Sequence, residues 1–322
     1  MGATDWVETV FDMTDPEQAW ENIFARLKDL AMSSPSYVDL HDRTVSVDRL
    51  LSEGAWELWN LYMDKAPKTS KKLVEWCHEP SASGKAVLVL DALSLREMPF
   101  ILGGAESRGI KPVCVGATGS EVPSDTDHFA HALGVASRSS LSNNGASSCF
   151  TLFDREVFTD VLNFPFEDCL GSVPNEKNVF IWHTWLDDLI HVHKKAPDHI
   201  SKLASETLQG DGFWKFLDRL RQGRKLLITA DHGYATSRLF SSEEIDQEVI
   251  QVLRETFGAS RYKAASRRWE KRFMPPIVLT HNNFHVVMGQ RKWTVQGGFP
   301  QICHGGLSLL EVAVPFLELP SI

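Results

Sequence analysis

Short runs of consecutive apolar residues recur in the middle and last parts of the chain. They lie at residues 85–91 (KAVLVLD), 178–183 (NVFIWH), 225–230 (KLLITA) and 284–288 (FHVVM). Uninterrupted apolar runs of this length are typical of strands that are covered on both faces. Because helical segments separate the runs, we expect an α/β domain with a mostly parallel central sheet, which begins after the Ser/Gly-rich residues 81–84.

The first 83 residues carry a helical pattern instead. Asp15 can cap a helix and Pro16 suits the first helical position. The buried face of that helix is expected to hold Trp20, Ile23, Phe24 and Leu27. A second helical stretch, near Val47 to Cys77, has Leu and Trp at spacings of three and four residues. We therefore predict a small helical N-terminal region at 1–83, which packs against the α/β domain at 84–322.

The segment between the first two strand-like runs of this domain contains a polar loop. Residues 137–148 (SRSSLSNNGASS) are rich in Ser, Asn and Gly, and the aromatic-rich residues 150–166 follow. Loops of this length inside a compact domain are uncommon unless they serve a site. We predict a cap insertion near residues 135–177.

Composition excludes several classes of protein. With 43% hydrophobic and 23% charged residues the chain is globular, and its net charge of −9 argues against a surface that binds nucleic acid everywhere. A local basic patch stays open. Five cysteines without close pairs fit neither a disulfide framework nor a zinc ribbon. Without an apolar run long enough for a membrane, and with an acidic rather than signal-like N-terminus, we expect a cytoplasmic protein.

Polar residues stand where the strand-like runs end, which is where open α/β sheets bind ligands. Asp91 ends the first run, and Asp231 and His232 end the third. Asp187 and His191 are four residues apart, so on a helix they share one face. Carboxylate and imidazole together suit a divalent metal such as Zn²⁺ or Mn²⁺. Each pattern alone is equally compatible with a helix cap, a turn or a surface pair.

Two further positions suit chemistry at a loop or helix start. Thr126 precedes a helical pattern, where its hydroxyl could cap the helix or act as a nucleophile activated by the helix dipole and a metal. Ser120 and Ser124 are nearby alternatives, and Thr126 is preferred for its spacing to the helix. His304 lies in a Gly-rich loop (HGGLS) whose glycines let the backbone approach a ligand.

The order of these motifs resembles that of the PglZ-domain family of the alkaline phosphatase superfamily. The resemblance covers residues 85–319, and its most specific parts are TADHG at 229–233 and HGGLSLLE at 304–311. It implies an alkaline-phosphatase-like sandwich. It also implies two metal sites: one is formed by Asp187, His191 and His304, and the other by Asp91, Asp231, His232 and the Thr126 hydroxyl.

The resemblance further implies the reaction. Two divalent ions, Zn²⁺ first and Mn²⁺ as the alternative, would serve an in-line displacement at phosphorus. Thr126 would form a covalent phospho-threonine. The implied enzyme is a phosphodiesterase or nuclease-like hydrolase that acts on a phosphate ester such as a nucleotide or oligonucleotide. Family context implies bacterial anti-phage defence or nucleotide signalling, with partner proteins of a defence system and no membrane.

Substrate-binding cations are harder to identify. Relatives often have an Arg soon after the first Asp, whereas this chain has Ser94 and then Arg96. Residues 261–272 are basic and include Tyr262 and Trp269, a mixture that suits a nucleotide or single strand but also a solvated helix face. The candidates for binding substrate phosphate are Arg96, Arg267 and Arg268.

Three other functions are compatible with parts of the pattern. A phosphomonoesterase would use the same metal ligands. A scaffold subunit of a defence complex would keep the metal for structure and dock through residues 1–83. A sulfatase is disfavoured because no cysteine stands in a Cys-x-Pro-x-Arg setting.

Overall fold

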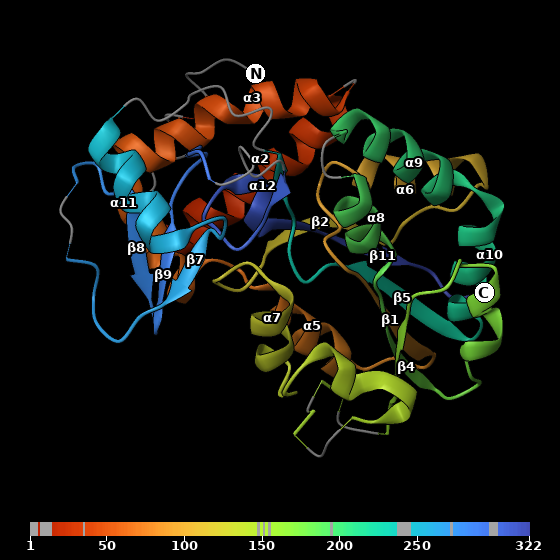
Figure 1. Ribbon diagram of the computed structural model, residues 1–322. Coiled ribbons are helices and arrows are strands. Elements are labelled where there is room, and N and C mark those ends of the chain that lie inside the picture. The colour runs from red at the N-terminus through yellow and green to blue at the C-terminus, as the bar shows by residue number, and fades with distance from the viewer. Residues whose placement is uncertain are drawn as a thin grey trace.

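A six-stranded sheet forms the centre of the protein, for which we have a computed structural model (Figure 1). The structure describes residues 6, 15–34, 36–146, 149, 150, 152, 153, 156–193, 196–236, 246–270, 273–295 and 302–322. The sheet order is β2-β11-β5-β1-β4-β3. The strands are β1 (Gly84–Leu90), β2 (Cys114–Gly119), β3 (Phe158–Leu162), β4 (Asn178–His183), β5 (Arg224–Thr229) and β11 (Ala313–Leu319).

This sheet is mostly parallel, as the apolar runs predict. β1 pairs in parallel with both β4 and β5, and β3 pairs in parallel with β4. β11 alone among these strands runs antiparallel to its neighbours β2 and β5. The protein is therefore an α/β protein with N-terminal helices, and the fold class is confirmed.

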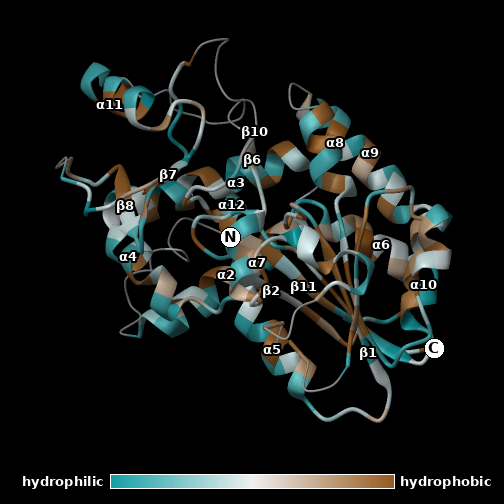
Figure 2. Cartoon of the chain, turned by 60° about the horizontal axis from the view of Figure 1, so that its bottom comes forward, coloured by the Kyte–Doolittle hydropathy of each residue, from teal (hydrophilic) through white to brown (hydrophobic). Residues whose placement is uncertain are grey.

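Helices cover both faces of the sheet. Successive residues of β1 point to opposite faces, so each face packs against different helices. Ala86 and Leu88 belong to an apolar cluster that includes residues of α6 (Met98–Ser107) and α10 (Asp211–Arg221). Val87 and Val89 belong to another, which includes residues of α5 (Thr69–His78) and α7 (Thr126–Ala132). Figure 2 shows the strands in brown between these helices. On the side of α6 also lie α8 (Trp185–His193) and α9 (Pro197–Gln209).

The N-terminal region is helical as predicted. It comprises α2 (Pro16–Ser33), α3 (Tyr37–Arg49), the π-helical turn η1 (Leu50–Gly54), α4 (Trp56–Lys65) and α5. The Asp15 carboxylate caps α2 by accepting from Glu17 N at 3.0 Å. The predicted face is buried and consists of Trp20, Ile23, Phe24 and Leu27. The second stretch begins earlier than expected, at Tyr37, and is interrupted at 50–55 and at 66–68.

These helices are joined to the rest of the protein by buried polar contacts. Asp48 of α3 accepts from Leu309 N at 2.7 Å, and Tyr62 donates to the carbonyl of Ser120 at 3.0 Å. The side chains of α2 and α4 also share the apolar cluster of the central sheet. The division at residue 83 into a separate region stays a prediction.

A second lobe holds a small antiparallel sheet. Its strands are β7 (Tyr262–Ala264), β8 (Val278–His281) and β9 (Phe284–Val287), next to α11 (Gln247–Phe257) (Figure 1). The prediction of a strand at 284–288 is right, but its place in the parallel sheet is wrong. The two-residue turn at Asn282 and Asn283, with Asn282 at φ 50°, makes β8 and β9 an antiparallel hairpin.

The remaining elements are short. They are η2 (Arg138–Asn144), η3 (Asp168–Ser172), the paired strands β6 (Ala235–Thr236) and β10 (Ile302–Cys303), and α12 (Leu309–Val312). The predicted cap at 135–177 contains η2 and η3, but β3 within it joins the edge of the main sheet. The extent of a cap stays a prediction. Among the described helices, none combines the length and apolarity needed to cross a bilayer.

Candidate metal centre

The adjacent parallel strands β1 and β5 end at the same side of the sheet and bring two acidic residues together. Asp91 follows the last residue of β1, and Asp231 lies two residues beyond the end of β5. Ala92 N donates to Asp231 Oδ1 at 3.0 Å, and Ala92 adopts φ 62° to do so. Both carboxylates are 0% exposed. The turn after β1 therefore holds two charged groups side by side in the interior.

Asp91, Asp231 and His232 form the group that we call the buried cluster. One potential ligand atom from each lies within 4.8 Å of the others. His232 Nε2 is 3.4 Å from Asp231 Oδ2 and 3.8 Å from Asp91 Oδ1. Because His232 Nδ1 lies 2.9 Å from the Gly233 carbonyl, it is the nitrogen placed to donate, which directs the Nε2 lone pair at the carboxylates.

The Thr126 hydroxyl lies against the buried cluster. Its Oγ1 donates to Asp231 Oδ2 at 2.8 Å and lies 3.5 Å from both Asp91 Oδ1 and His232 Nε2. Thr126 is the first residue of α7, but Asp125 caps that helix by accepting from His128 N at 2.9 Å. The Thr126 hydroxyl is thus not used as a helix cap.

The two alternative hydroxyls have other partners. Ser124 Oγ accepts from Gly305 N at 2.9 Å and donates to Gly306 O at 3.0 Å. Ser120 Oγ donates to the Glu121 carbonyl at 3.0 Å. Among the three hydroxyls considered from the sequence, Thr126 is the one that the structure joins to the buried cluster.

Asp187, His191 and His304 form a second group, which we call the outer cluster. Their potential ligand atoms also lie within 4.8 Å of one another, and His191 is exposed. Asp187 and His191 share one face of α8, with His191 Nε2 3.4 Å from Asp187 Oδ2, as their four-residue spacing predicts. The ring of His304 stacks on that of His232 with centroids 4.4 Å apart. The two clusters therefore adjoin.

The loop that carries His304 is fixed by the other residues of its motif. Glu311 accepts from Gly306 N at 3.1 Å through Oε1 and from the Ser308 hydroxyl at 2.6 Å through Oε2. Gly305 has φ 93°, and a Cβ there would lie 2.5 Å from the Tyr262 ring. The glycines thus serve close packing on the second lobe. Together with the Ser124 bridge, this fastens the His304 loop to the segment before Thr126.

The electrostatics of the two clusters favour a cation. Two buried carboxylates this close repel each other unless a positive charge lies between them. Burial lowers the pKa of His304 to about 3, which keeps its imidazole neutral and able to ligate. Burial likewise raises the pKa of Asp187. His304 Nδ1 is covered from solvent and has no hydrogen-bond partner among the described residues. Carboxylate, imidazole and hydroxyl donors in this arrangement fit divalent metal ions.

One charged residue of the metal centre, Arg138, was not predicted from the sequence. Arg138 of η2 forms an ion pair with Asp91 Oδ2, and its own side chain is 30% exposed. Within the described residues, it is the one Lys or Arg in an ion pair with either cluster. A single Arg in a polar Ser/Asn loop gives no periodic or spacing signal, and only the folded position of the loop brings it to Asp91.

The three arginines predicted to bind substrate phosphate lie elsewhere. Arg96 donates through Nη1 to the Tyr234 carbonyl, and Arg267 is exposed and pairs with Glu270 at 3.1 Å. Arg268 is exposed. In the described part of the chain, no hydrogen bond or ion pair connects these three to either cluster. Their role in binding phosphate stays a prediction.

The basic stretch after Gly258 is also not a helix face. Residues 262–264 form strand β7, and Arg261 is buried in an ion pair with Glu311 at 2.8 Å. The expectation that Arg261 contacts nucleic acid is not supported by this position, since the guanidinium serves the His304 loop. Lys271 and Arg272 lie outside the described residues.

Comparisons with known proteins were made for the sequence and the structure. The family model described as the BREX system PglZ alkaline phosphatase-like domain matches residues 146–319. A comparison with curated proteins finds no match. Among solved structures, phosphonoacetate hydrolase from Sinorhizobium meliloti 1021 is 14% identical, with a TM-score of 0.41 over 74% of this chain and 90% of that chain. Murine ectonucleotide pyrophosphatase / phosphodiesterase 5 is 12% identical, with a TM-score of 0.44 over 73% and 87%.

Proposed function

The chain belongs to the family of the BREX system PglZ alkaline phosphatase-like domain, whose model matches more than half of its residues, and from this premise we propose that it is a metal-dependent phosphoric ester hydrolase. One observation carries the proposal. The Thr126 hydroxyl lies against the buried cluster, which adjoins the outer cluster through the His232 and His304 rings, and the Asp and His donor atoms of both clusters suit divalent metals. A nucleophile next to two positive charges is the arrangement that phosphoryl transfer requires.

The residues of each cluster would hold one ion. Asp187, His191 and His304 would bind the first, while the buried cluster and the Thr126 hydroxyl would bind the second. When bound, the two ions would supply Lewis-acid charge for the attacking and leaving oxygens of an in-line displacement. Because both donor sets combine imidazole with carboxylate, Zn²⁺ is the first expectation and Mn²⁺ the alternative.

The residues around Thr126 orient the nucleophile. The hydrogen bond to Asp231 Oδ2 fixes Oγ1 at the carboxyl end of the sheet. In the proposed reaction Oγ1 gives its proton to solvent and forms a bond to phosphorus as the bond to the leaving oxygen breaks, and the leaving group departs with the bonding electron pair. Water then hydrolyses the resulting phospho-threonine and restores the hydroxyl. The first turn of α7, capped by Asp125 and not by Thr126, leaves that hydroxyl available for this role.

We propose that Arg138 binds the substrate. Its guanidinium is partly exposed and reaches Asp91, and this supports a contact with the phosphoryl group at the metal centre. A planar guanidinium can grip two oxygens of one phosphate. Relatives often have an Arg soon after the first Asp of the motif. We propose that Arg138 binds phosphate here in place of such an Arg.

The proposed substrate is a phosphodiester, including nucleotides and oligonucleotides. We further propose a role in bacterial antiviral defence, in the cytoplasm and with partner proteins; the family description names the BREX system. The exposed Lys263, Arg267 and Arg268 of the second lobe are proposed as further contacts for a nucleic acid chain, with Trp269 available for stacking.

The test compares a diester with a monoester. EDTA-treated protein is reloaded with Zn²⁺ or Mn²⁺ and assayed on bis-p-nitrophenyl phosphate and p-nitrophenyl phosphate. We expect the diester to be the faster substrate and Thr126→Ala to lose at least about 1,000-fold in rate, as removal of a nucleophile does. Thr126→Ser keeps a hydroxyl and is the matched control, which should retain measurable activity.

Two results would change the assignment. A faster monoester would make the protein a phosphomonoesterase of the same superfamily. Loaded protein that is inert toward both esters would refute the enzymatic function and favour a scaffold with a structural metal. Equal rates for wild type and Thr126→Ala would refute the proposed nucleophile.

A further inference from the structure

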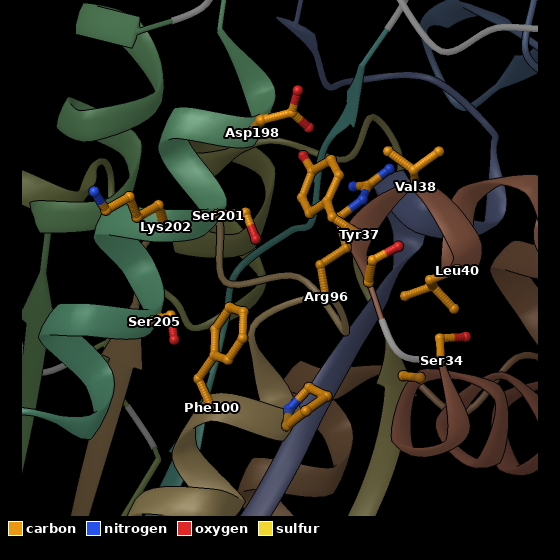
Figure 3. Close-up of a pocket in the computed structure, with 13 residues that line it drawn as sticks. Ser34, Tyr37, Val38, Leu40, Arg96, Phe100, Asp198, Ser201, Lys202 and Ser205 are labelled. Atoms are coloured by element: carbon orange, nitrogen blue, oxygen red, sulfur yellow. The ribbon is translucent and has the colours of Figure 1, made fainter.

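A cavity separate from the metal centre opens between α3, α6 and α9. Its volume is about 360 Å³, within the range of small-molecule sites. Figure 3 shows the labelled residues that surround it, which include Ser34, Tyr37, Phe100, Ser201 and Lys202. Arg96 lines it from the segment between β1 and α6. None of the residues in the buried or outer cluster lines this cavity.

Arg96 is buried with an incomplete set of hydrogen bonds. Its side chain belongs to a residue that is 4% exposed, and Nη1 donates to the Tyr234 carbonyl. The guanidinium carbon lies 4.7 Å from the ring centroid of Tyr37 and 4.9 Å from that of Tyr234. Nε and Nη2 have no hydrogen-bond partner within the part of the chain that the structure describes.

Those two nitrogens define a binding chemistry. Nε and Nη2 form one edge of the guanidinium, with two parallel N–H groups that match two oxygens of a carboxylate or phosphate. The two tyrosine rings lie against the guanidinium, and this edge has no hydrogen-bond partner among the described residues. Buried donors in this state are unfavourable, and a ligand that accepts from both would relieve the cost.

The acids near Arg96 do not fill this role. The neighbouring Glu97 accepts from the Tyr234 hydroxyl at 2.7 Å and from Ser94 N at 3.1 Å, so each of its oxygens already has a donor. Asp198 at the cavity is exposed and forms no ion pair with Arg96 among the described residues. The charged residues lining the cavity are thus Arg96, Lys202 and Asp198, and the cations outnumber the acid.

We propose that this cavity binds an oxyanion, a carboxylate or a phosphate group, held at the Nε–Nη2 edge of Arg96. The hydroxyl of Ser201 offers a further donor, and the rings of Tyr37 and Phe100 suit a small apolar or aromatic part of the ligand. Because Arg96 is only 4% exposed, a lining side chain shifts when the oxyanion enters. The same guanidinium holds the carbonyl of Tyr234, two residues beyond His232, which connects the cavity to the metal centre.

The test is calorimetric titration of the metal-free full chain in EDTA with sodium phosphate and, separately, with sodium acetate. Sodium chloride at equal ionic strength controls for screening. We expect saturable binding of one oxyanion per chain to wild type. Arg96→Lys keeps the charge but loses the two-pronged edge, and we expect its affinity to fall by about tenfold or more. The matched control is Arg49→Lys, at an exposed arginine that does not line the cavity.

A second variant covers the case in which Arg96→Lys fails to fold. Ser201→Phe fills the cavity from α9 and leaves every contact of Arg96 in place, and it should abolish binding. Binding of phosphate or of acetate that is lost in Ser201→Phe supports the proposal and identifies the oxyanion. No saturable binding of either anion to wild type overturns it. So does binding that persists in Ser201→Phe, or that is lost instead in Asp231→Asn, which would locate the anion at the metal centre.

Discussion

Replacement of Asp231 by Asn distinguishes what this side chain contributes to folding from what it contributes to metal binding. The side chain accepts from Ala92 N at 3.0 Å and from the Thr126 hydroxyl at 2.8 Å. Asparagine can keep the first bond through Oδ1 and can donate to the Thr126 oxygen through Nδ2, so the local hydrogen bonds survive. The substitution also removes one of two buried negative charges. In metal-free protein we therefore expect Asp231→Asn to unfold at the same temperature as wild type or at a higher one.

In the presence of metal, wild type should instead unfold at a higher temperature than Asp231→Asn. A ligand present at 100 times its dissociation constant stabilises a folded protein by about 2.7 kcal/mol. Loss of an outer-shell partner weakens metal binding by about 10- to 100-fold, so loss of a ligand should weaken it at least about 100-fold. At the same metal concentration the stabilisation from the buried cluster then falls to about 0.4 kcal/mol, while the outer cluster keeps its own. Since 1 kcal/mol shifts Tm by roughly 2–4 °C in domains of this order of size, the rise in Tm with metal should be several degrees smaller in the variant than in wild type.

The assay is a thermal melt with EDTA, with Zn²⁺ and with Mn²⁺. Asp29→Asn, at an exposed carboxylate that pairs with Lys28, is the matched control and should gain as much as wild type. If Asp231→Asn gains as many degrees with metal as wild type does, Asp231 is not a ligand and the reasoning about the buried cluster fails. A large loss of stability in EDTA would instead show that the carboxylate is needed for the fold.

Three further substitutions test other parts of the account. Glu311→Ala removes the carboxylate that pairs with buried Arg261, and we expect the free energy of unfolding measured in urea to fall by about 3–5 kcal/mol. The control Ser308→Ala should lower it much less. Burial raises the pKa of Asp48 from 3.8 to about 7, so its contribution to stability is present below about pH 4 and is lost as the pH rises to about 7. Asp48→Asn should therefore flatten the pH dependence of unfolding in that window, by at most about 1.4 kcal/mol per pH unit, and an unchanged slope would contradict this. Arg138→Ala should raise KM for the diester by about tenfold without changing metal content, and a fall in metal content instead would assign Arg138 to the metal site.

Much of the fold follows from the period of the apolar residues. The runs at β1, β4 and β5 are buried along their whole length or nearly so, and continuous apolar runs of that kind report a central parallel strand directly. β2 and β3 escape this reasoning because their residues are largely half-buried. The apolar run at β9 correctly predicted a strand, but such a run does not determine which sheet the strand joins.

The candidate site was predictable where local spacing determines geometry. Asp187 and His191 share a helix face, and Asp91 and Asp231 stand at the ends of adjacent strands. The proximity within each pair can therefore be predicted from the sequence. The approach of His304 depends on contacts across the chain, from Ser124 to Gly305 and from Arg261 to Glu311. No spacing encodes those contacts, and the family resemblance supplied that residue instead.

Arg96 and Arg138 show what sequence reasoning could not resolve. Arg96 follows Asp91 closely in sequence and was the predicted candidate, whereas Arg138 lies in a polar loop that gives no such signal. The fold turns Arg96 away from the metal centre to the Tyr234 carbonyl and brings Arg138 from η2 to Asp91. Which cation meets a phosphate is decided by tertiary structure.

The most direct test of the central claim is the number of metal ions per chain. Wild type and His191→Ala, each dialysed against Zn²⁺ and then against metal-free buffer, are measured by elemental analysis. His191 is exposed and belongs to the outer cluster alone, so its loss should leave the fold and the buried cluster intact. We predict two ions per chain in wild type and one in His191→Ala. No bound metal in wild type, or equal content in both proteins, would contradict two adjoining metal sites.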